Sequence, residues 1–519
     1  MRGSIAFVRL VVNRIGFLGV IQYCENSFTE RSRLMKICFI NPPFKPEHGK
    51  FSRESRSPAI GHSGVLYYPL WLIYAAAVAK ECGFDVAFID APAKQMNVEQ
   101  TLERVAGEAG DAKLFVFDTS TPSIFSDVEF AGMIKERYPE AFTLLVGTHP
   151  SATVEETMGY SSRIDGIARR EFDYIVRDLA IALRDGTALS EVKGLSWRNG
   201  DAVVHNPDAE FITDMDAIPF ASKFIKEYLC VTDYVFAAAA FPSIQIFTGR
   251  GCPARCNFCV YPQTMHGHRY RLRSVESVIE ELEYIVANFP EVKEVVFEDD
   301  TFTISKERVT QICQQMIDKG LNKRLRWLCN ARVNLDYDTM CMMKKAGCHL
   351  IIPGIESVNQ QILKNIRKGT TVEQIEKYVA NARKAGLMIH ACYMVGNEGE
   401  TRQTMEETLA AAMRFKTDTA QFYPLIPYPG TEAYDWAKRN GYLQGSYADY
   451  VHEDGTLNCV ISTPELSAQD LVDFCSRARK KYYLRPWYIC HRIWNGLRDF
   501  EDLKRSLKAF KKLKQSVFR

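Results

Sequence analysis

The sequence predicts an α/β protein in which a doubly wound parallel sheet is followed by a partial (β/α)6 barrel and a helical C-terminal region. Two observations predict this class. Apolar runs of five or six residues alternate with amphipathic stretches in two separate series, and a segment near residues 186–240 interrupts the alternation. Such alternation is typical of parallel sheets that helices cover on both faces. At 519 residues, the chain is long enough for two or more domains.

The first series predicts a Rossmann-like domain over residues 35–185. A helical pattern over YPLWLIYAAAVAKECG (68–83) ends at a glycine, and further helical patterns separate the later strands. Ligands of doubly wound sheets bind at the carboxyl ends of the strands, so the loops after these strands are candidate binding segments. The expected strands are KICFI (36–40), DVAFID (85–90), KLFVFD (113–118), FTLLVG (142–147) and IDGIA (164–168).

Residues 186–240 are expected to form a linker with a hairpin, because they contain several glycines and prolines. A second series over residues 241–435 predicts a partial TIM-type barrel of six strands, from SIQIFTGR (243–250) to TAQFYPLIPYPG (419–430). Catalytic groups of such barrels gather at the carboxyl ends of the strands. Polar motifs at these ends are EDD (298–300), NARV (330–333) and GIES (354–357).

The two ends of the chain are expected to differ from the domains between them. Residues 1–34 are basic and moderately apolar, and Arg9 and Arg14 interrupt their apolar run. We therefore expect a poorly ordered extension rather than a signal peptide or an anchor. Residues 436–519 are expected to form a basic helical region. Its part 477–519 holds 14 Lys and Arg against 3 Asp and Glu, a net charge of +11.

Composition and charge exclude several classes of protein. Hydrophobic residues make up 46% and charged residues 25% of the chain, as in ordinary globular proteins. A formal net charge of only +2 gives no reason to expect a nucleic-acid partner. No apolar run reaches the roughly 20 residues that span a bilayer. The 15 cysteines are scattered through apolar segments, which indicates a reduced, cytoplasmic protein rather than a secreted disulfide framework.

Three cysteines stand close together in GRGCPARCNFCVYP (249–262), directly after the first strand of the second series. Cys252, Cys256 and Cys259 have the spacing Cys-x3-Cys-x2-Cys. On a tight loop, this spacing is typical of thiolates that bind an iron–sulfur cluster. Three thiolates leave one iron open. The alternatives are three buried cysteines without metal, or a zinc site whose fourth ligand is a nearby histidine, His266 or His268.

With Phe258 as the aromatic residue before the last cysteine, residues 244–435 resemble the radical S-adenosylmethionine enzymes. The resemblance implies that the three cysteines bind a [4Fe–4S] cluster and that S-adenosylmethionine chelates its fourth iron. One electron, from a donor such as flavodoxin or ferredoxin, then cleaves S-adenosylmethionine to a 5′-deoxyadenosyl radical. This radical abstracts hydrogen from an unactivated carbon, while the protein positions and shields it.

The same resemblance implies roles for the motifs at the strand ends. Glu356, which precedes Ser357 in GIES, is expected to bind the adenosyl ribose. Glu298 and Asp299 are expected to meet the methionyl amino group, and Arg332 is expected to pair with a carboxylate. Taken singly, each of these residues would more commonly be an ordinary ion-pair partner. Their common position at strand ends favours one shared site.

The first series resembles the cobalamin-binding half of the cobalamin-dependent radical S-adenosylmethionine enzymes, on the motifs FINPPF, GHSGVLYYPLWLIYAAAVAK, DTSTPS and VGTHPSA within residues 35–220. The resemblance implies bound cobalamin. An Asp-x-His-x-x-Gly pattern, which gives cobalt a histidine in some proteins, is absent, so His149 is expected to hydrogen-bond its own loop backbone. The alternative is a sheet domain that has lost its ligand or binds substrate. The residues expected to line the corrin are Thr119, Ser120, Thr121, Thr148, His149 and Ser151.

These features predict an enzyme that modifies an unactivated carbon of a small, hydrophobic, lipid-like molecule. Cobalamin-dependent C-methylation is the expected reaction. The resemblance also includes hopanoid-modifying enzymes and the anaerobic magnesium-protoporphyrin ester cyclase, so oxidative cyclisation or ring rearrangement is the alternative reaction. A zinc-bearing binding protein without activity is the alternative from another class. Aromatic and basic residues interleave over 480–497 and 502–515. A solvated face of terminal helices is the usual interpretation, and peripheral contact with anionic lipid is the alternative, which points to a lipid-like substrate.

Overall fold

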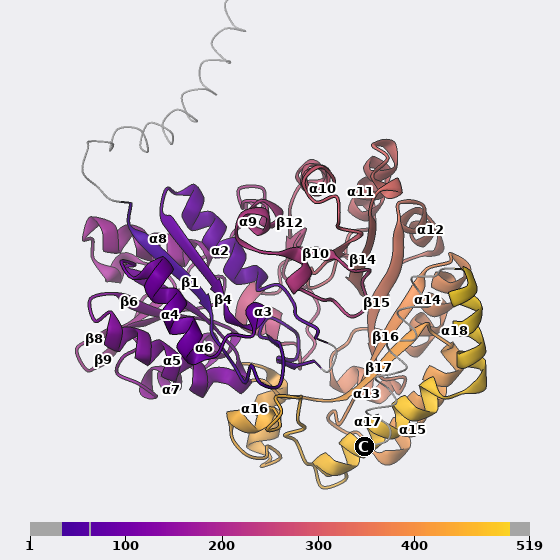
Figure 1. Cartoon of the computed structure of the whole chain (residues 1–519). Coiled ribbons are helices and arrows are strands. Elements are labelled where there is room, and N and C mark those ends of the chain that lie inside the picture. Colours follow the sequence, from indigo (N-terminus) through magenta and orange to yellow (C-terminus); the bar gives the residue numbers. More distant parts are fainter. Residues whose placement is uncertain (1–33, 62–63, 499–519) are drawn as a thin grey trace, which may run out of the picture.

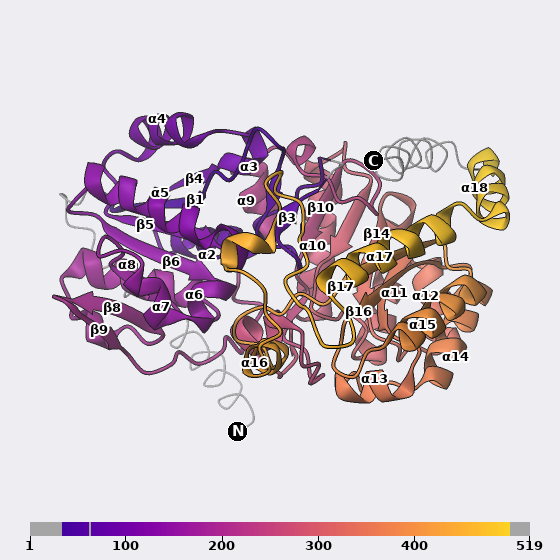
Figure 2. The same cartoon turned by 90° about the horizontal axis from the view of Figure 1, so that it is seen from below.

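The computed structural model describes residues 34–61 and 64–498, which form two α/β units side by side (Figures 1 and 2). A seven-stranded sheet builds the first unit, and a six-stranded sheet builds the second. This architecture confirms the predicted fold class. The expected N-terminal extension lies outside the described residues, apart from Leu34, and so does the end of the basic C-terminal region.

The first sheet is doubly wound. Its strands are β1 (Lys36–Asn41), β4 (Asp85–Asp90), β5 (Leu114–Thr119), β6 (Phe142–Gly147), β7 (Gly166–Ala168), β8 (Leu195–Asn199) and β9 (Ala202–His205). Their order is β4–β1–β5–β6–β7–β8–β9, and the first five in this order are parallel. The strand order reverses at β1, which lies between β4 and β5. A ligand of such a sheet is therefore expected beside the carboxyl end of β1.

The hairpin of β8 and β9 extends this sheet, because β8 pairs antiparallel with β7. The sheet thus continues beyond residue 185, where the sequence pattern ended the first domain. Two short strands are marginal alone, and pairing with an open edge stabilises them. The connector to the second sheet contains η2 (Leu189–Glu191), α9 (Ala221–Tyr228) and η3 (Val231–Asp233).

Helices cover both faces of the first sheet, so its strands are buried on both sides and consist almost wholly of apolar residues. Ile37 of β1 faces one core and Cys38 faces the other, because successive side chains point to opposite faces. The first core includes α2 (Leu70–Glu81) and α8 (Asp173–Asp185), and the second includes α4 (Val98–Ala109), α5 (Ile124–Arg137) and α7 (Val154–Gly159). Shorter elements are β2 (Phe51–Ser52), β3 (Ala59–Ile60), α3 (Ala91–Lys94), η1 (Thr121–Ser123) and α6 (Thr148–Ala152).

The second sheet is an open, partial barrel. Its parallel strands are β10 (Ser243–Ile246), β13 (Glu294–Phe297), β14 (Arg326–Ala331), β15 (Cys348–Glu356), β16 (Met388–Val395) and β17 (Thr419–Pro424). Each strand pairs with the next one along the chain, without a reversal, and β10 and β17 are the two edges. Its helices are α10 (Val275–Asn288), α11 (Lys306–Asp318), α12 (Tyr337–Lys345), α13 (Gln360–Asn365), α14 (Val372–Lys384) and α15 (Arg402–Phe415), with the turn η5 (Leu321–Lys323).

Helix α2 joins the two units. Its first ten residues are buried, and it is apolar on all sides, as expected of a helix that neighbouring layers cover. The Tyr74 hydroxyl accepts a 3.1 Å hydrogen bond from the Phe247 amide, just after β10. Trp71 packs edge-on against Tyr261 of the second unit. The helix therefore fixes the start of the barrel against the first sheet.

The C-terminal region is helical at both ends and extended between them. α16 (Glu432–Arg439) follows the barrel, and α17 (Ala468–Tyr483) and α18 (Pro486–Arg498) end the described chain. The Tyr483 hydroxyl donates to the Ala420 carbonyl at 2.7 Å, so α17 packs on β17. The intervening residues 440–466, with η6 (Tyr447–Tyr450), reach back to the first unit, where the Ile60 amide donates to the Gly455 carbonyl at 2.8 Å.

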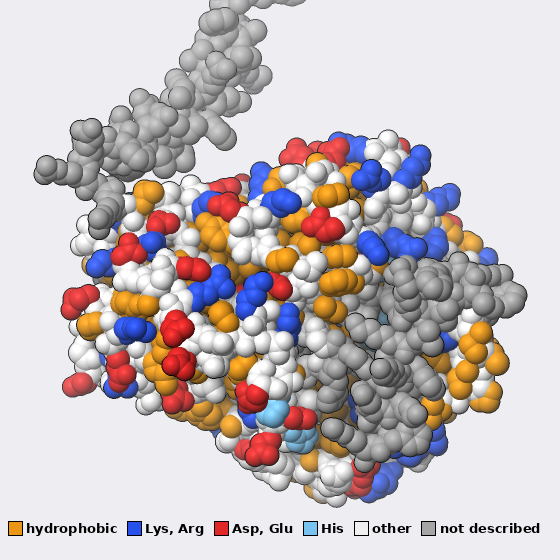
Figure 3. Space-filling model, in the orientation of Figure 1, with side chains coloured by type: hydrophobic (Ala, Val, Ile, Leu, Met, Phe, Trp, Pro, Cys, Tyr) orange, Lys and Arg blue, Asp and Glu red, His pale blue; other side chains and the backbone are white. Residues whose placement is uncertain are grey.

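Charged side chains of both signs are mixed on the surface. The face in Figure 3 carries Lys and Arg beside Asp and Glu over both units. In the described ranges, 34–61 and 64–498, no helix has the length and apolarity to cross a membrane. The stretch expected to contact lipid is described only in part, because residues 499–519 are not.

Candidate active site

The cysteine loop follows β10 and is closed by a small hairpin. β11 (Gly249–Arg250) pairs antiparallel with β12 (Arg271–Leu272) at the base of the loop. Gly251 has a φ of +86°, and a Cβ atom there would collide with the Arg269 carbonyl oxygen. Only glycine fits this position, so the chain bends sharply just before Cys252.

A side chain from the turn after the cysteines holds the loop backbone. In the π-helical turn η4 (Pro262–His266), the Gln263 amide donates to the carbonyls of Cys256 at 3.3 Å and Cys259 at 2.9 Å. Cys252 and Cys256 are buried and Cys259 is half-buried. Burial raises the pKa of Cys259 to about 12, so its thiol stays protonated at neutral pH until a cation binds.

The zinc alternative finds no support in the described geometry. Within residues 34–61 and 64–498, no group of three or more His, Cys, Asp and Glu side chains is arranged to hold a metal ion. His266 Nδ1 lies 3.0 Å from Asp300 Oδ2, and His268 Nδ1 lies 2.9 Å from the Ala254 carbonyl oxygen. A four-iron cluster is wider than a single ion and holds its thiolates farther apart, so this finding concerns the zinc alternative alone.

Glu298 and Asp299 follow β13 in different environments. Glu298 is half-buried, and its Oε2 accepts from Gln245 Nε2 at 3.2 Å. Asp299 is fully buried, and its carboxylate accepts from the Thr248 amide at 2.6 Å and from the Thr248 hydroxyl at 2.7 Å. Asp299 thus holds the end of β10, and its expected contact with a ligand stays a prediction. Glu298 remains accessible.

Asp300, which sequence reasoning did not single out, contacts the cysteine loop. Its Oδ2 accepts from the Gly251 amide at 2.9 Å and lies 3.0 Å from His266 Nδ1. Burial alone would raise the pKa of Asp300, but the adjacent His266 outweighs it and holds that pKa below its ordinary value. Oδ1 is buried without a partner among the described residues. The only signal in the sequence is its place as the third acid of EDD.

Arg332 lies against the cysteines. Its Nη1 is 3.8 Å from Cys256 Sγ, and its Nη2 donates to the Lys368 carbonyl. The side chain turns toward the loop of the first strand, and its expected pairing with a carboxylate stays a prediction. The arrangement places a fixed positive charge beside a candidate thiolate.

Glu356 ends β15 in an unusual backbone conformation. Its φ is +64°, a region that residues other than glycine rarely adopt, and such strain is common at functional sites. Lys368 Nζ donates to its Oε1 at 2.8 Å, and the Tyr423 hydroxyl donates to its Oε2 at 3.1 Å. A Cβ on Gly354 would collide with this carboxylate. No motif in the sequence pointed to Lys368 or Tyr423, because both come from other segments.

Ser357 and Phe258 take supporting positions. Ser357 is buried, and its hydroxyl accepts from the Asn359 amide at 3.1 Å, which shapes the turn before α13. It therefore does not face the site. Phe258 is half-buried, and Lys368 Nζ lies 5.8 Å from its ring centroid. Phe258 thus connects the cysteine loop to the Lys368–Glu356 pair.

A residue of the first unit also reaches this area. Arg56 lies in the long loop after β1, and its Nη2 donates to the Asp299 carbonyl at 3.4 Å. Its guanidinium lies 5.2 Å from the centroid of the Tyr261 ring. The side chain remains exposed, so Arg56 brings a positive charge to the edge of the cysteine loop. Nothing in the local sequence distinguishes it from a surface arginine.

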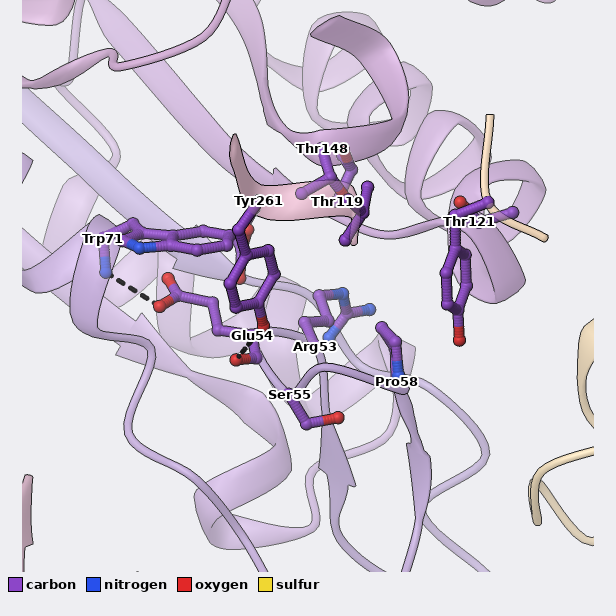
Figure 4. Close-up of a pocket in the computed structure, with 12 residues that line it drawn as sticks. Arg53, Glu54, Ser55, Pro58, Trp71, Thr119, Thr121, Thr148 and Tyr261 are labelled. Atoms are coloured by element: carbon purple, nitrogen blue, oxygen red, sulfur yellow. Dashed lines mark hydrogen bonds between the residues drawn. The ribbon is translucent and has the colours of Figure 1, made fainter. Parts of the chain in front are cut away.

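A cavity lies between the carboxyl ends of the first sheet and the start of the barrel (Figure 4). Thr119, Thr121 and Thr148 line it, as expected for the candidate corrin site. Val260 and Tyr261 also line it, and they directly follow Cys259. The cavity therefore extends from the first sheet to the cysteine loop. Its other lining residues are Arg53, Glu54, Ser55, Pro58, Trp71, Asp118 and Tyr428.

Ser120 and Ser151 do not line this cavity, although both were expected to. The Ser120 hydroxyl lies 2.8 Å from the Ser123 hydroxyl, within the turn that η1 forms. Ser151 donates to the Gly147 carbonyl at 2.7 Å, within α6. Both side chains therefore hold the turns that present Thr121 and Thr148, and their expected contact with the corrin stays a prediction.

His149 is buried behind the cavity wall. Its Nδ1 lies 3.2 Å from the Thr121 hydroxyl. The expected hydrogen bond to its own loop backbone is therefore replaced by one to a neighbouring side chain. The ring also packs edge-on against Tyr447. Burial lowers the pKa of His149 to about 3, so the ring is neutral at physiological pH.

Three buried polar atoms of the cavity-lining residues, Trp71 Nε1, Asp118 Oδ2 and the Tyr428 hydroxyl, have no hydrogen-bond partner among the described residues. Buried polar atoms are almost always hydrogen-bonded, so these three atoms indicate a ligand with polar groups of its own. Burial raises the pKa of Asp118 to about 8, so its carboxyl group is protonated at neutral pH. Glu54 lies in the same wall and accepts from the Trp71 amide at 2.8 Å, at the start of α2.

Two family models match the chain, one for each sheet. The B12 binding domain matches residues 56–180, and the Radical SAM superfamily matches residues 246–412. A relative in Pyrococcus horikoshii, Uncharacterized methyltransferase PH0819, is 30% identical over 456 residues, which cover 88% of this chain and 94% of the relative. The chain belongs to the radical SAM enzymes that carry a B12-binding domain.

Other similar proteins agree with this family. The anaerobic magnesium-protoporphyrin IX monomethyl ester cyclase of Cereibacter sphaeroides is 27% identical over 435 residues, which cover 82% of this chain and 69% of the relative. The radical SAM methyltransferase TsrM from Kitasatospora setae superposes with a TM-score of 0.64 at 17% identity, covering 86% of this chain and 91% of that chain. At this identity, the superposition shows a shared fold.

A radical SAM enzyme with a B12-binding domain uses a [4Fe–4S] cluster, S-adenosylmethionine and cobalamin, and acts on a small molecule. The residues present fit these cofactors. Three loop cysteines offer thiolates and leave one iron open for S-adenosylmethionine. The cavity wall offers an unpaired donor and an unpaired carboxyl group, which suit the amide side chains of cobalamin.

Proposed function

We propose that this protein is a cobalamin-dependent methyltransferase that methylates an unactivated carbon of a small, hydrophobic, lipid-like molecule. The observation that carries the proposal is the single cavity that the first sheet and the cysteine loop share. Thr119 and Thr148 line it from the sheet, and Tyr261 lines it from the segment after Cys259. The cavity marks the junction of the two units, so cofactors held by each unit beside this junction would face the same substrate.

In this proposal, Cys252, Cys256 and Cys259 are the cluster ligands. Gln263 holds two of their carbonyls, and Arg332 places its charge beside Cys256 Sγ. When bound, the cluster and S-adenosylmethionine supply a 5′-deoxyadenosyl radical, and cobalamin supplies a methyl group. The chain fixes the loop that carries the thiolates, so a bound cluster would lie beside the same side chains.

We assign S-adenosylmethionine to the strand ends beside this loop. Glu356 is fixed by Lys368 and Tyr423, and its carboxylate is the proposed acceptor for the ribose hydroxyls. Glu298 is the proposed acceptor for the methionyl amino group, since it is accessible whereas Asp299 is not. Both acids follow barrel strands at the same edge of the sheet, where such enzymes place their reacting groups.

Cobalamin is assigned to the wall that the first sheet contributes. Thr119, Thr121 and Thr148 would contact its amide side chains, with Asp118 and Trp71 as further partners. Cobalt would receive no histidine from this loop, because the His149 ring is buried against Thr121 and Tyr447. Ser120 and Ser151 would then act only by stabilising the two turns that carry Thr121 and Thr148.

The inner side of the second sheet supports a hydrophobic substrate. Half-buried Tyr67 and Ile352 pack against a small apolar cluster there, which is separate from the main core. Tyr67 also lies near Cys392 and Glu298, which contribute to its raised pKa after burial, the largest cause. We further propose flavodoxin or ferredoxin as the electron donor, and a cytoplasmic enzyme that meets lipid through the basic residues of 480–515.

The test uses anaerobically reconstituted protein, a chemical reductant and S-adenosylmethionine with a deuterated methyl group, supplied with candidate hydrophobic metabolites. Methyl transfer yields S-adenosylhomocysteine and a product in which a CD3 group replaces one hydrogen atom. Oxidative cyclisation or rearrangement, the second candidate because of the cyclase relative, yields neither. A product that gains no label, formed without S-adenosylhomocysteine, would therefore replace methyl transfer with the second candidate.

A pH-dependent stability difference is expected at Asp118. Its pKa is about 8 in the folded chain and about 3.9 in an unfolded one, so folding takes up a proton between these values. The free energy of unfolding should therefore fall as pH rises through this window, by up to about 1.4 kcal/mol per pH unit. Asp118→Asn should remove this contribution.

Chemical denaturation of the cobalamin-free protein at pH 5 and pH 8 measures this difference. We expect the variant to gain stability relative to wild type at pH 8 more than at pH 5. Asp165→Asn is a control in a half-exposed acid of the same domain, away from the cavity. Equal pH slopes for wild type and Asp118→Asn would show that the carboxyl group is not buried as described.

A further inference from the structure

A cluster of four buried charges connects the two units beside the cysteine loop. Arg250 Nη1 and Nη2 donate to the Asp173 carboxylate at 2.7 and 2.9 Å, and Arg250 Nη1 also lies 3.1 Å from Glu171 Oε1. Arg271 Nη1 donates to Glu171 Oε2 at 2.6 Å, and Nη2 to Oε1 at 3.1 Å. Glu171 and Asp173 belong to the first unit, whereas both arginines belong to the hairpin that closes the loop.

This cluster is fully covered. The four side chains expose at most 4% of their surface. Arg250 also stacks 5.1 Å from the Tyr74 ring centroid of α2. Removing such charges from water costs several kcal/mol per ion, so a buried ion pair is weak as a source of stability. A role in fixing geometry is the better-supported use of such a network.

The four buried charges hold both ends of the cysteine loop. Arg250 stands two residues before Cys252, and it pairs with Arg271 in the β11–β12 ladder. Arg271 Nη2 also donates to the His266 carbonyl at 2.9 Å. His266 in turn pairs with Asp300, which accepts from the amide before Cys252. Moving either carboxylate would therefore shift the loop as a whole.

The segment that carries Glu171 and Asp173 is also hydrogen-bonded to the wall assigned to cobalamin. The Arg170 amide, one residue before Glu171, donates to the Ser151 hydroxyl at 2.9 Å. Ser151 belongs to α6, which presents Thr148 to the cavity. A chain of short contacts thus joins the cavity wall, the acidic pair and the cysteine loop.

We propose that Glu171 and Asp173 are positioning residues that fix the cysteine loop relative to the first sheet, so that a bound iron–sulfur cluster would face the cobalamin wall in one orientation. This inference rests on the proposed cluster ligands. It concerns how the loop is held, and it does not depend on whether the final reaction is methyl transfer.

The test compares reconstituted wild type with Glu171→Gln and Asp173→Asn. Both variants keep side-chain size but lose the charge that holds the guanidinium groups. We expect iron content to be retained, the EPR spectrum of the reduced cluster with S-adenosylmethionine to change, and cleavage of S-adenosylmethionine to fall about 10- to 100-fold. Glu171→Asp keeps the charge and should restore part of the cleavage rate.

Glu294→Gln is the control, because Glu294 is also a buried acid with a side-chain partner, His349, but lies at the amino end of β13, away from the hairpin. We expect it to lower stability without changing the EPR spectrum. Wild-type spectra and rates in both Glu171→Gln and Asp173→Asn would overturn the proposal, and so would equal changes in the control. Arg250→Lys, which keeps charge and loses the fork, repeats the test if the acidic variants fold poorly.

The proposed function fails in a different way. Wild-type protein that assembles the cluster and cleaves S-adenosylmethionine, but never forms S-adenosylhomocysteine, would contradict methyl transfer. The comparison of EPR spectra between wild type and variants would be unaffected by that outcome.

Discussion

Cys256→Ala is expected to abolish cluster-dependent cleavage of S-adenosylmethionine while the chain stays folded. Cys256 is buried between the loop backbone and Arg332, and it is the middle one of three proposed thiolates. Two thiolates hold a four-iron cluster poorly, so the reconstituted variant should lose iron. Removing one buried sulfur costs only about 1 kcal/mol in stability, a typical value for a single substitution.

Cys475→Ala is the matched control for this prediction. Cys475 is equally buried but lies on α17, and its thiol contacts no part of the cysteine loop that the structure describes. Iron and sulfide content, the absorbance of the cluster and formation of 5′-deoxyadenosine should all match wild type in the control. Wild-type cleavage by Cys256→Ala would contradict the assignment of the ligands.

Glu356→Gln is expected to weaken S-adenosylmethionine binding about 10- to 100-fold, because a hydrogen bond to a charged group contributes about 1.5–3 kcal/mol. Glu356 is 4% exposed, and Lys368 and Tyr423 fix both of its oxygens. Neutralising it also leaves the Lys368 ammonium group buried and unpaired, which costs about 3–5 kcal/mol in stability. The affinity is measured by equilibrium binding to the reconstituted, unreduced protein.

A double variant separates these two effects. Glu356→Gln with Lys368→Met removes both charges, so stability should recover largely, whereas affinity for S-adenosylmethionine should stay low. If affinity recovers together with stability, the carboxylate acts only through the fold. A single Glu356→Gln variant with wild-type affinity would show that Glu356 does not contact the cofactor.

Most of the fold was predictable from the sequence because its signals are local. The buried strands of both series are short apolar runs, because helices cover both faces of a parallel sheet and neither face needs polar residues. A hairpin was expected within residues 186–240, but its pairing with the first sheet was not, because its partly exposed strands carry no such run and its partner strand, β7, is formed earlier in the chain.

The site was predictable only in part. The cysteines form one compact motif, whereas Lys368, Tyr423 and Arg56 join it from segments that the fold alone brings together. Side-chain direction was the second obstacle. Of three consecutive acids, the middle one turns inward to Thr248 and the third turns to the cysteine loop, and sequence does not show which acid faces which way.

The same obstacle explains the loops of the first sheet. Thr121 and Thr148 line the cavity, whereas Ser120 and Ser151 turn back to hold the chain, because adjacent residues in a tight turn point in different directions. Asp118 was missed for another reason. It lies inside a strand that is otherwise apolar, and only the cavity beside it shows that its carboxyl group has no partner.

One measurement tests the central claim most directly. Wild-type protein, reconstituted anaerobically with the cluster and cobalamin, is reduced and given S-adenosylmethionine, and the products are quantified by mass spectrometry. We predict that both 5′-deoxyadenosine and S-adenosylhomocysteine form, because the proposed function requires both radical formation and methyl transfer. Protein that carries both cofactors and forms neither product would contradict a cobalamin-dependent radical methyltransferase.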